Sequence, residues 1–322
     1  MRIRMMGAAL ALSAGVGLGA VGGGANAALE YYRVWGVMDA ELASVLVTGE
    51  TLSLAPGGVE RLGAGGRTVG ALLGAARSGG AEWGVDLSAG PGTLVPHLGE
   101  MRASAKIVAG DALRCAAAGD GAGAGERAAA VFRMSMQSSG DEILISSLVG
   151  MAVGNLGVQL TEQLIDGGSI GAAEAAVVLG AIRAGEGADR YAMEDAIVGE
   201  WRLMSEFIVK HAPAEDPGGW LMEQAGFAED APAAEKLLSM SRSEMMRELG
   251  GFAEYHADLL AAWKARDSAA LEEAERGVEA GAYGVLTELL GATLTRAYAS
   301  DRESEKRLGA LVERLEGIIA DG

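Results

Sequence analysis

Nineteen consecutive residues without a charged side chain, from Ile143 to Thr161, most strongly limit how this chain can fold. A helix of that length is long enough to cross a membrane. The run nevertheless contains Asn155 and Gln159 with several Gly and Ser residues, and acidic residues flank it. A membrane span of that composition would insert poorly. We therefore expect a helix that other layers of the protein cover, and no transmembrane span in the mature chain.

The same segment has a helical pattern. Its polar side chains recur at spacings of four, three and four residues, which places them on one face of a helix. Apolar side chains gather on another face. The polar face comprises Asn155, Gln159, Glu162 and Asp166, and the apolar face comprises Ile145, Val149, Leu156, Leu160 and Leu164.

The distribution of proline favours helices throughout. The six prolines leave two long tracts free, one between His97 and Ala212 and one after Pro232. A proline inside a helix costs about 3 kcal/mol, so such tracts suit helices. The 50 glycines show no collagen-like period, and segments that alternate apolar and polar residues are scarce. We predict an all-α fold of stacked helical hairpins, either solenoid-like or an irregular bundle.

Residues 1–27 have the pattern of a signal peptide. Arg2 and Arg4 precede an uncharged run rich in Ala, Leu, Gly and Val, and the run ends in Ala25-Asn26-Ala27. Signal peptidase cleaves after small residues in this arrangement. The prediction is export to the periplasm or cell envelope, with cleavage near Ala27. Retention of the segment as a membrane anchor is the alternative.

The rest of the chain divides by composition. Residues 28–211 form a predicted N-terminal helical region, residues 212–232 a Pro/Gly-rich loop, and residues 233–322 an acidic helical region packed on the first. Within the loop, "APAEDPGGW" concentrates helix breakers. We expect Trp220 to anchor it by burying its ring. A mobile linker between independent domains is the alternative.

Charge, cysteine and histidine content exclude several functions. The net charge of −18 lies wholly beyond residue 140, and no basic patch is present, so we predict no nucleic-acid partner. The lone Cys115 excludes an intrachain disulfide, and we expect it to be buried. Three histidines cannot form a His-rich metal site, so we predict no metal and no cofactor. His256 is expected to pack half-buried in a helix, and His211 to be exposed.

One cluster of chemically capable residues stands out. A loop with two prolines and two glycine pairs or near-pairs leads into a helix, and it carries carboxylates, a tryptophan and a histidine. The candidate binding residues are Glu82, Trp83, Asp86 and His97, and the candidate catalytic residues are Asp86, His97 and Glu100. The structural alternative is that Trp83 fills a helix layer, Asp86 caps a turn and His97 bonds a backbone carbonyl.

This loop and the following helices resemble a family of exported, largely uncharacterised bacterial helical proteins. The resemblance covers roughly residues 80–300 and implies a helical, exported protein without implying an activity. A weaker likeness to tetratricopeptide hairpins rests on Ala128, Phe132 and Ser135. The residues that carry the main resemblance are Trp83, Asp86, Gly90, Pro91, Leu94, Pro96, His97, Leu98, Leu144, Ile145, Ser146, Leu148 and Val149.

These patterns lead to two functional hypotheses. The first is an exported scaffold, or a protein that binds a peptide or another protein in the cell envelope, because stacked hairpins present long grooves. The alternative is an envelope hydrolase that uses carboxylates and His97 near the Trp83 loop. The conformation of the loop from Trp83 to His97 distinguishes them: a deep pocket with converging polar groups favours catalysis, and a filled, buried loop favours a scaffold.

Overall fold

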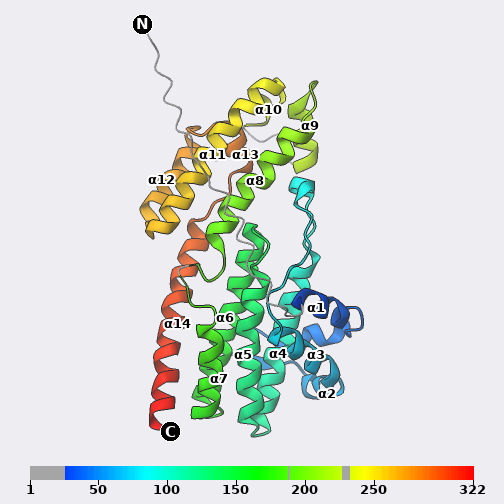
Figure 1. Ribbon diagram of the computed structural model, residues 1–322, viewed down its shortest axis with the longest axis vertical. Coiled ribbons are helices and arrows are strands. Elements are labelled where there is room, and N and C mark those ends of the chain that lie inside the picture. The colour runs from blue at the N-terminus through cyan, green and yellow to red at the C-terminus, as the bar shows by residue number, and fades with distance from the viewer. Residues whose placement is uncertain (1–25, 188, 227–232) are drawn as a thin grey trace.

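The computed structural model describes residues 26–187, 189–226 and 233–322 (Figure 1). The predicted signal peptide therefore lies outside the described residues except for Asn26 and Ala27. The protein is about 74% helical, and the strands of its described residues are one pair of two residues each, so the all-α prediction is confirmed.

Small elements lie against one side of a bundle of longer helices. The small elements are α1 (Ala27–Trp35), the 3-10 helix η1 (Ala40–Ser44), β1 (Leu46–Val47), β2 (Ser53–Leu54), α2 (Gly58–Ala64) and α3 (Gly66–Arg77). The 3-10 helix η2 (Leu87–Gly92) follows them and packs on helices from later in the chain. Strands β1 and β2 pair antiparallel, with Leu46 opposite Leu54. The bundle follows with α4 (Pro96–Ala117), α5 (Gly121–Ser138), α6 (Leu144–Asp166) and α7 (Ala172–Arg183).

The remaining helices occupy the upper half of Figure 1, except the last one. Helix α11 packs on α8, α12 and α13. The last helix, α14, runs down the side of the molecule to the lower end of the bundle (Figure 1). These helices are α8 (Met193–His211), α9 (Pro217–Ala225), α10 (Ala234–Leu238), α11 (Arg242–Ala265), α12 (Ser268–Glu279), α13 (Val285–Leu290) and α14 (Thr295–Asp321).

Helix α5 is the centre of the bundle. It contacts α4, α6 and α7, and α14 packs back on α6 and α7. Leu311 and Leu315 of α14 belong to the same buried core as Val131 and Phe132 of α5. In a solenoid each repeat contacts only its neighbours. The return of α14 gives the lower half the irregular-bundle arrangement instead.

Helix α6 contains the uncharged run. It is the one helix of the described residues that is long and apolar enough to cross a membrane, by length and composition. Of its most apolar 18-residue window, 67% is buried inside the protein. The neighbouring helices α4, α5, α8 and α14 supply this cover.

The polar face predicted for this helix meets other parts of the chain. Gln159 donates to the carbonyl of Gly49 (2.7 Å) in the turn between β1 and β2. Glu162 pairs with Arg307 of α14 at 2.6 Å. Asp166 pairs with Arg314, about two turns further along α14, also at 2.6 Å. The polar stripe, formed by Gln159, Glu162 and Asp166, therefore determines where the β1–β2 hairpin and α14 pack on α6.

The segment 212–232 differs from the loop we expected. Residues 217–225 form helix α9, because Pro217 occupies the first turn and the Asp216 side chain accepts from Gly219 N at 2.9 Å. Trp220 lies on this helix, half-buried, and its ring stacks on Phe207 of α8 with centroids 5.3 Å apart. Residues 227–232 lie outside the described part of the chain.

The isolated histidines and the cysteine have clear environments. Cys115 is buried, and burial raises the pKa of its thiol. His211 is exposed, as expected. His256 is more buried than expected: the residue is 4% exposed, its Nδ1 lies 2.9 Å from Phe252 O, and desolvation lowers its pKa.

Close packing of α6 on α5 gives the first prediction. A Cβ at Gly150 would lie 2.8 Å from the backbone oxygen of Ser135, which cannot rotate away. Overpacking of this kind costs about 1–3 kcal/mol, more than the roughly 1 kcal/mol that Gly→Ala gains in a helix. We expect Gly150→Ala to lower the free energy of unfolding, measured by urea denaturation.

Gly180 of α7 is the matched control, because a Cβ there would meet nothing within 4 Å. Gly180→Ala should raise the free energy of unfolding by about 0.5–1 kcal/mol. Equal stabilisation by both substitutions would contradict the close contact at Gly150.

Candidate functional site

The loop from Glu82 to His97 is held by Trp83. The residue is 5% exposed, and its indole Nε1 donates to the backbone oxygen of Gln137 at 2.8 Å. One face of its ring system stacks with Trp35 (centroids 5.6 Å, interplanar angle 10°), and it also stacks with His97 (4.7 Å, 18°). Trp83 therefore contacts α1, α4 and α5 at once.

His97 lies in the first turn of α4 and is buried. Its side chain is 1% exposed, and its Nε2 lies 2.7 Å from Oδ2 of Asp141. The Ser146 hydroxyl donates to the same oxygen at 3.1 Å. Because the serine bonds the carboxylate and not the imidazole, this arrangement differs from a nucleophile–base pair.

Gln137 of α5 completes this buried polar network. Its Oε1 accepts from the Tyr31 hydroxyl at 2.8 Å, and its Nε2 donates to Gly79 O at 3.0 Å and to Ser78 O at 3.2 Å. Burial raises the pKa of Tyr31 above the ordinary value for tyrosine. Hydrogen bonding of this kind offsets the cost of burying polar groups and ties α1 and α3 to α5.

The three candidate carboxylates lie on the surface. Asp86 caps η2 by accepting from Ser88 N at 2.9 Å, and these Ser88 hydrogen bonds lower its pKa. Glu82 is exposed, and its backbone N–H and C=O bond the Asn26 side chain. Glu100 is exposed on α4.

The structure therefore brings together only Trp83 and His97 of the five predicted residues. Within the described ranges, no hydrogen bond or ion pair joins His97 to Glu82, Asp86 or Glu100. The structural alternative holds for Trp83 and Asp86, while His97 bonds a carboxylate where we expected a backbone carbonyl.

Sequence reasoning missed Asp141, the partner of His97. The two residues are 44 positions apart, and Asp141 lies in the turn between α5 and α6. Spacing along one helix cannot indicate such a pair. A signal was nevertheless present, because an acidic residue at the entry to the uncharged run needs a partner if the run is buried.

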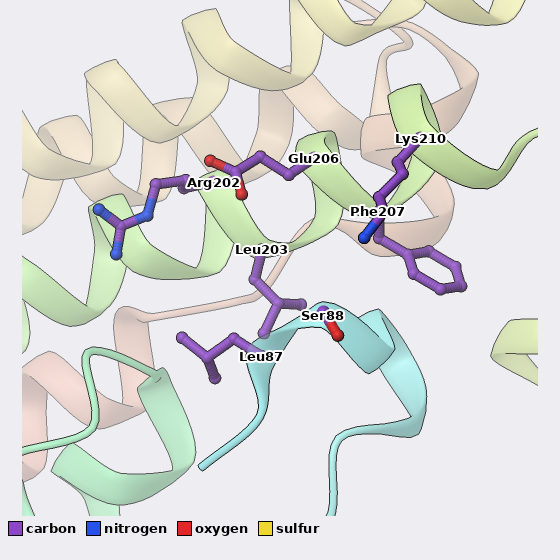
Figure 2. Close-up of a pocket in the computed structure, with 7 residues that line it drawn as sticks. All are labelled: Leu87, Ser88, Arg202, Leu203, Glu206, Phe207 and Lys210. Atoms are coloured by element: carbon purple, nitrogen blue, oxygen red, sulfur yellow. The ribbon is translucent and has the colours of Figure 1, made fainter. Parts of the chain in front are cut away.

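The outer side of the same loop forms an open cavity of about 380 Å³ against α8 (Figure 2). Figure 2 shows Leu203 pointing from α8 toward Leu87 on η2. Charged side chains of α8 surround these apolar groups, and Arg202 also pairs with Glu142. The lining consists of Leu87, Ser88, Arg202, Leu203, Glu206, Phe207 and Lys210.

Gly90 allows η2 to lie this close to α8. Its backbone has φ 56° and ψ −128°, a region that only glycine adopts readily. A Cβ at this position would overlap the ring of Phe207. Pro91 follows and fixes the next φ angle. The Gly-Pro pair therefore sets how η2, which carries Leu87 and Ser88, lies against α8.

The cavity has the chemistry of a binding surface. It combines an apolar centre with two cations and one carboxylate, and it lacks a histidine or cysteine. Throughout the part of the chain that the structure describes, no group of three or more His, Cys, Asp or Glu residues could hold a metal ion. Apolar surface with a few oriented polar groups is typical of ligand and peptide sites.

A second cavity, of about 370 Å³, lies on the other side of η2. Its walls are mostly apolar and include Ile143, Leu148 and Met204. Glu200 lines it, and burial raises the pKa of this carboxyl. One carboxyl without a second reactive group provides no acid–base pair.

No protein-family model, curated protein or solved structure matches this chain. The resemblance to exported helical proteins therefore stays a prediction.

The His97–Asp141 pair gives the second prediction. Asp141→Ala leaves His97 without its partner in a buried site, which costs about 1–3 kcal/mol. We expect a corresponding fall in the free energy of unfolding, measured by chemical denaturation. Glu100→Gln, an exposed change on the same helix as His97, should leave it within about 0.5 kcal/mol of the wild type. A wild-type stability for Asp141→Ala would refute a structural role for the pair.

Proposed function

We propose that this protein is an exported helical scaffold of the cell envelope that binds a peptide segment, and that the cavity between η2 and α8 accepts that segment. The observation that carries the proposal is the division of the 82–97 loop. Its inner side chains, Trp83 and His97, are buried and pack in the core. Its outer side, with Leu87 and Ser88, forms one wall of an open cavity.

The composition of the cavity supports a peptide as ligand. Leu87, Leu203 and Phe207 can contact an apolar side chain. Arg202 and Lys210 can pair with acidic side chains or carbonyl oxygens, and Glu206 can accept backbone N–H groups. A mixture of this kind is typical of the rim and centre of protein interfaces.

The rigidity of the loop also supports binding. Trp83 fixes one end, the Asp86 cap orders η2, and Gly90 seats η2 on Phe207. A surface that is ordered before its ligand arrives loses less conformational entropy on binding. The scaffold therefore provides a preformed wall for the segment.

Export is supported by the sequence of residues 1–27. The described chain begins with Asn26, whose side chain accepts from Ala28 N and bonds the backbone of Glu82. Cleavage after Ala27 would remove this helix cap, whereas cleavage just before Asn26 would retain it. Loss of an Asn cap costs about 1 kcal/mol, so the position of the cut affects stability.

Site-specific photocrosslinking tests the binding proposal. A photoreactive phenylalanine derivative at Ser88, in the producing cells, should give a discrete adduct identified by mass spectrometry. Lys210→Glu should reduce its yield by about fivefold or more, because charge reversal at the rim repels acidic groups. Lys236→Glu, an exposed reversal on α10 outside the cavity, is the matched control. Equal adduct yields in the two charge-reversal variants would contradict the site. So would the same adduct from a probe at Arg247, which is exposed on α11 outside the cavity.

N-terminal sequencing tests export. Protein recovered from the envelope fraction should begin within a few residues of Ala28, because the signal peptide is removed. Exported protein that still begins with Met1 would overturn the cleavage proposal and favour a retained anchor. A cut before Asn26 and a cut after Ala27 are distinguished in the same measurement.

A further inference from the structure

A third cavity concentrates positive charge in a protein that is acidic overall. The chain has a net charge of −18, yet a cavity of about 240 Å³ is lined by Arg102, Lys106 and Arg307. No acidic side chain is among the described residues that line it. A concentration of positive charge against the overall balance attracts anions.

Four elements build this cavity. Arg102 and Lys106 are four residues apart on α4, so they project from one face of that helix. Asn155 lies on the facing helix α6, and Arg307 comes from α14. The turn after β1 contributes Thr48. Both α4 and α14 contact α6, so the three cations approach one space from two sides.

Two of the cations have no acidic partner. Among the residues that the structure describes, Arg102 and Lys106 form no ion pair, whereas Arg307 pairs with Glu162 at 2.6 Å. The cavity therefore holds about two uncompensated positive charges. A phosphate monoester carries about −1.5 to −2 at neutral pH, which matches this excess.

The hairpin position is maintained by Gln159. Its Nε2 donates to Gly49 O at 2.7 Å and to Glu50 O at 3.1 Å, which holds the turn beside α6. The donors left for a ligand are therefore the three cations, the Asn155 amide and the Thr48 hydroxyl. Phosphate oxygens accept from guanidinium and ammonium groups in charge-assisted hydrogen bonds.

The remaining wall of the cavity is apolar. Ala152, Val153 and Leu156 of α6 lie beside the cationic groups. A bare inorganic anion would leave this surface in contact with water. An organic group on the anion would cover it.

From this combination we propose that the cavity binds a small organic phosphate monoester, with its phosphate on Arg102, Lys106 and Arg307 and its apolar part on α6. This site is separate from the cavity between η2 and α8 and does not depend on peptide binding. The small volume limits the ligand to a compact molecule.

Isothermal titration calorimetry at constant ionic strength tests the proposal with phenyl phosphate, inorganic phosphate, benzoate and phenol. Phenyl phosphate should bind, with inorganic phosphate weaker and phenol undetectable. In Arg102→Gln/Lys106→Gln the Kd should rise by about tenfold or more, because two charge-assisted hydrogen bonds are lost. Since neither cation forms an ion pair with any residue that the structure describes, the double variant should keep the wild-type thermal transition.

Lys306→Gln is the matched control, because Lys306 is exposed on α14 beside Arg307 without lining the cavity. Its Kd for phenyl phosphate should equal that of the wild type. Absence of binding, or the same loss in the control and the double variant, would overturn the site. Benzoate binding as tight as phenyl phosphate would overturn the assignment to phosphate esters.

Discussion

The burial of helix α6 is the constraint on which the bundle depends. Its uncharged run removes a large apolar surface from water only if several helices cover it at once. Helix α5 approaches it closely because Gly150 leaves room for the backbone of Ser135. The polar stripe from Gln159 to Asp166 then receives the hairpin and α14 by hydrogen bonds and ion pairs. The apolar and polar faces of α6 thus determine the positions of most of the elements that pack on it.

The inner and outer sides of the 82–97 loop perform different tasks. On the inner side, the Trp83 indole and the Gln137 carboxamide connect the first helices to α5 through side-chain and backbone hydrogen bonds. On the outer side, η2 extends toward α8 and creates surface. A loop fixed in this way connects the lower bundle to the upper helices, since η2 contacts both α8 and α9. Gly90 and Pro91 give the loop the backbone conformation that lets η2 reach α8.

Sequence patterns predicted the class of fold and much of its detail because helices are encoded locally. Proline-free tracts, the period of α6 and the surroundings of Cys115 are properties of neighbouring residues. The pairing of His97 with Asp141 depends on how two turns meet after packing, and local spacing carries no trace of it. Helix α9 was missed for a related reason: Asp216 and Pro217 read as helix breakers, yet they start a helix when the following residues can pack on Phe207. Asp86 and Glu100 are likewise close to His97 in the sequence, yet both are exposed and neither bonds it among the described residues.

The return of α14 to the bundle affects the order in which this protein can become compact. The pairs Glu162–Arg307 and Asp166–Arg314 join residues 145 and 148 positions apart. The ribosome synthesises α6 long before α14. The side of α6 that α14 covers therefore stays exposed while about half of the chain is added. Such delayed contacts slow folding, and exposed apolar surface invites association with other chains in the interval. The growing chain therefore has a defined period in which binding by a holding chaperone would protect it.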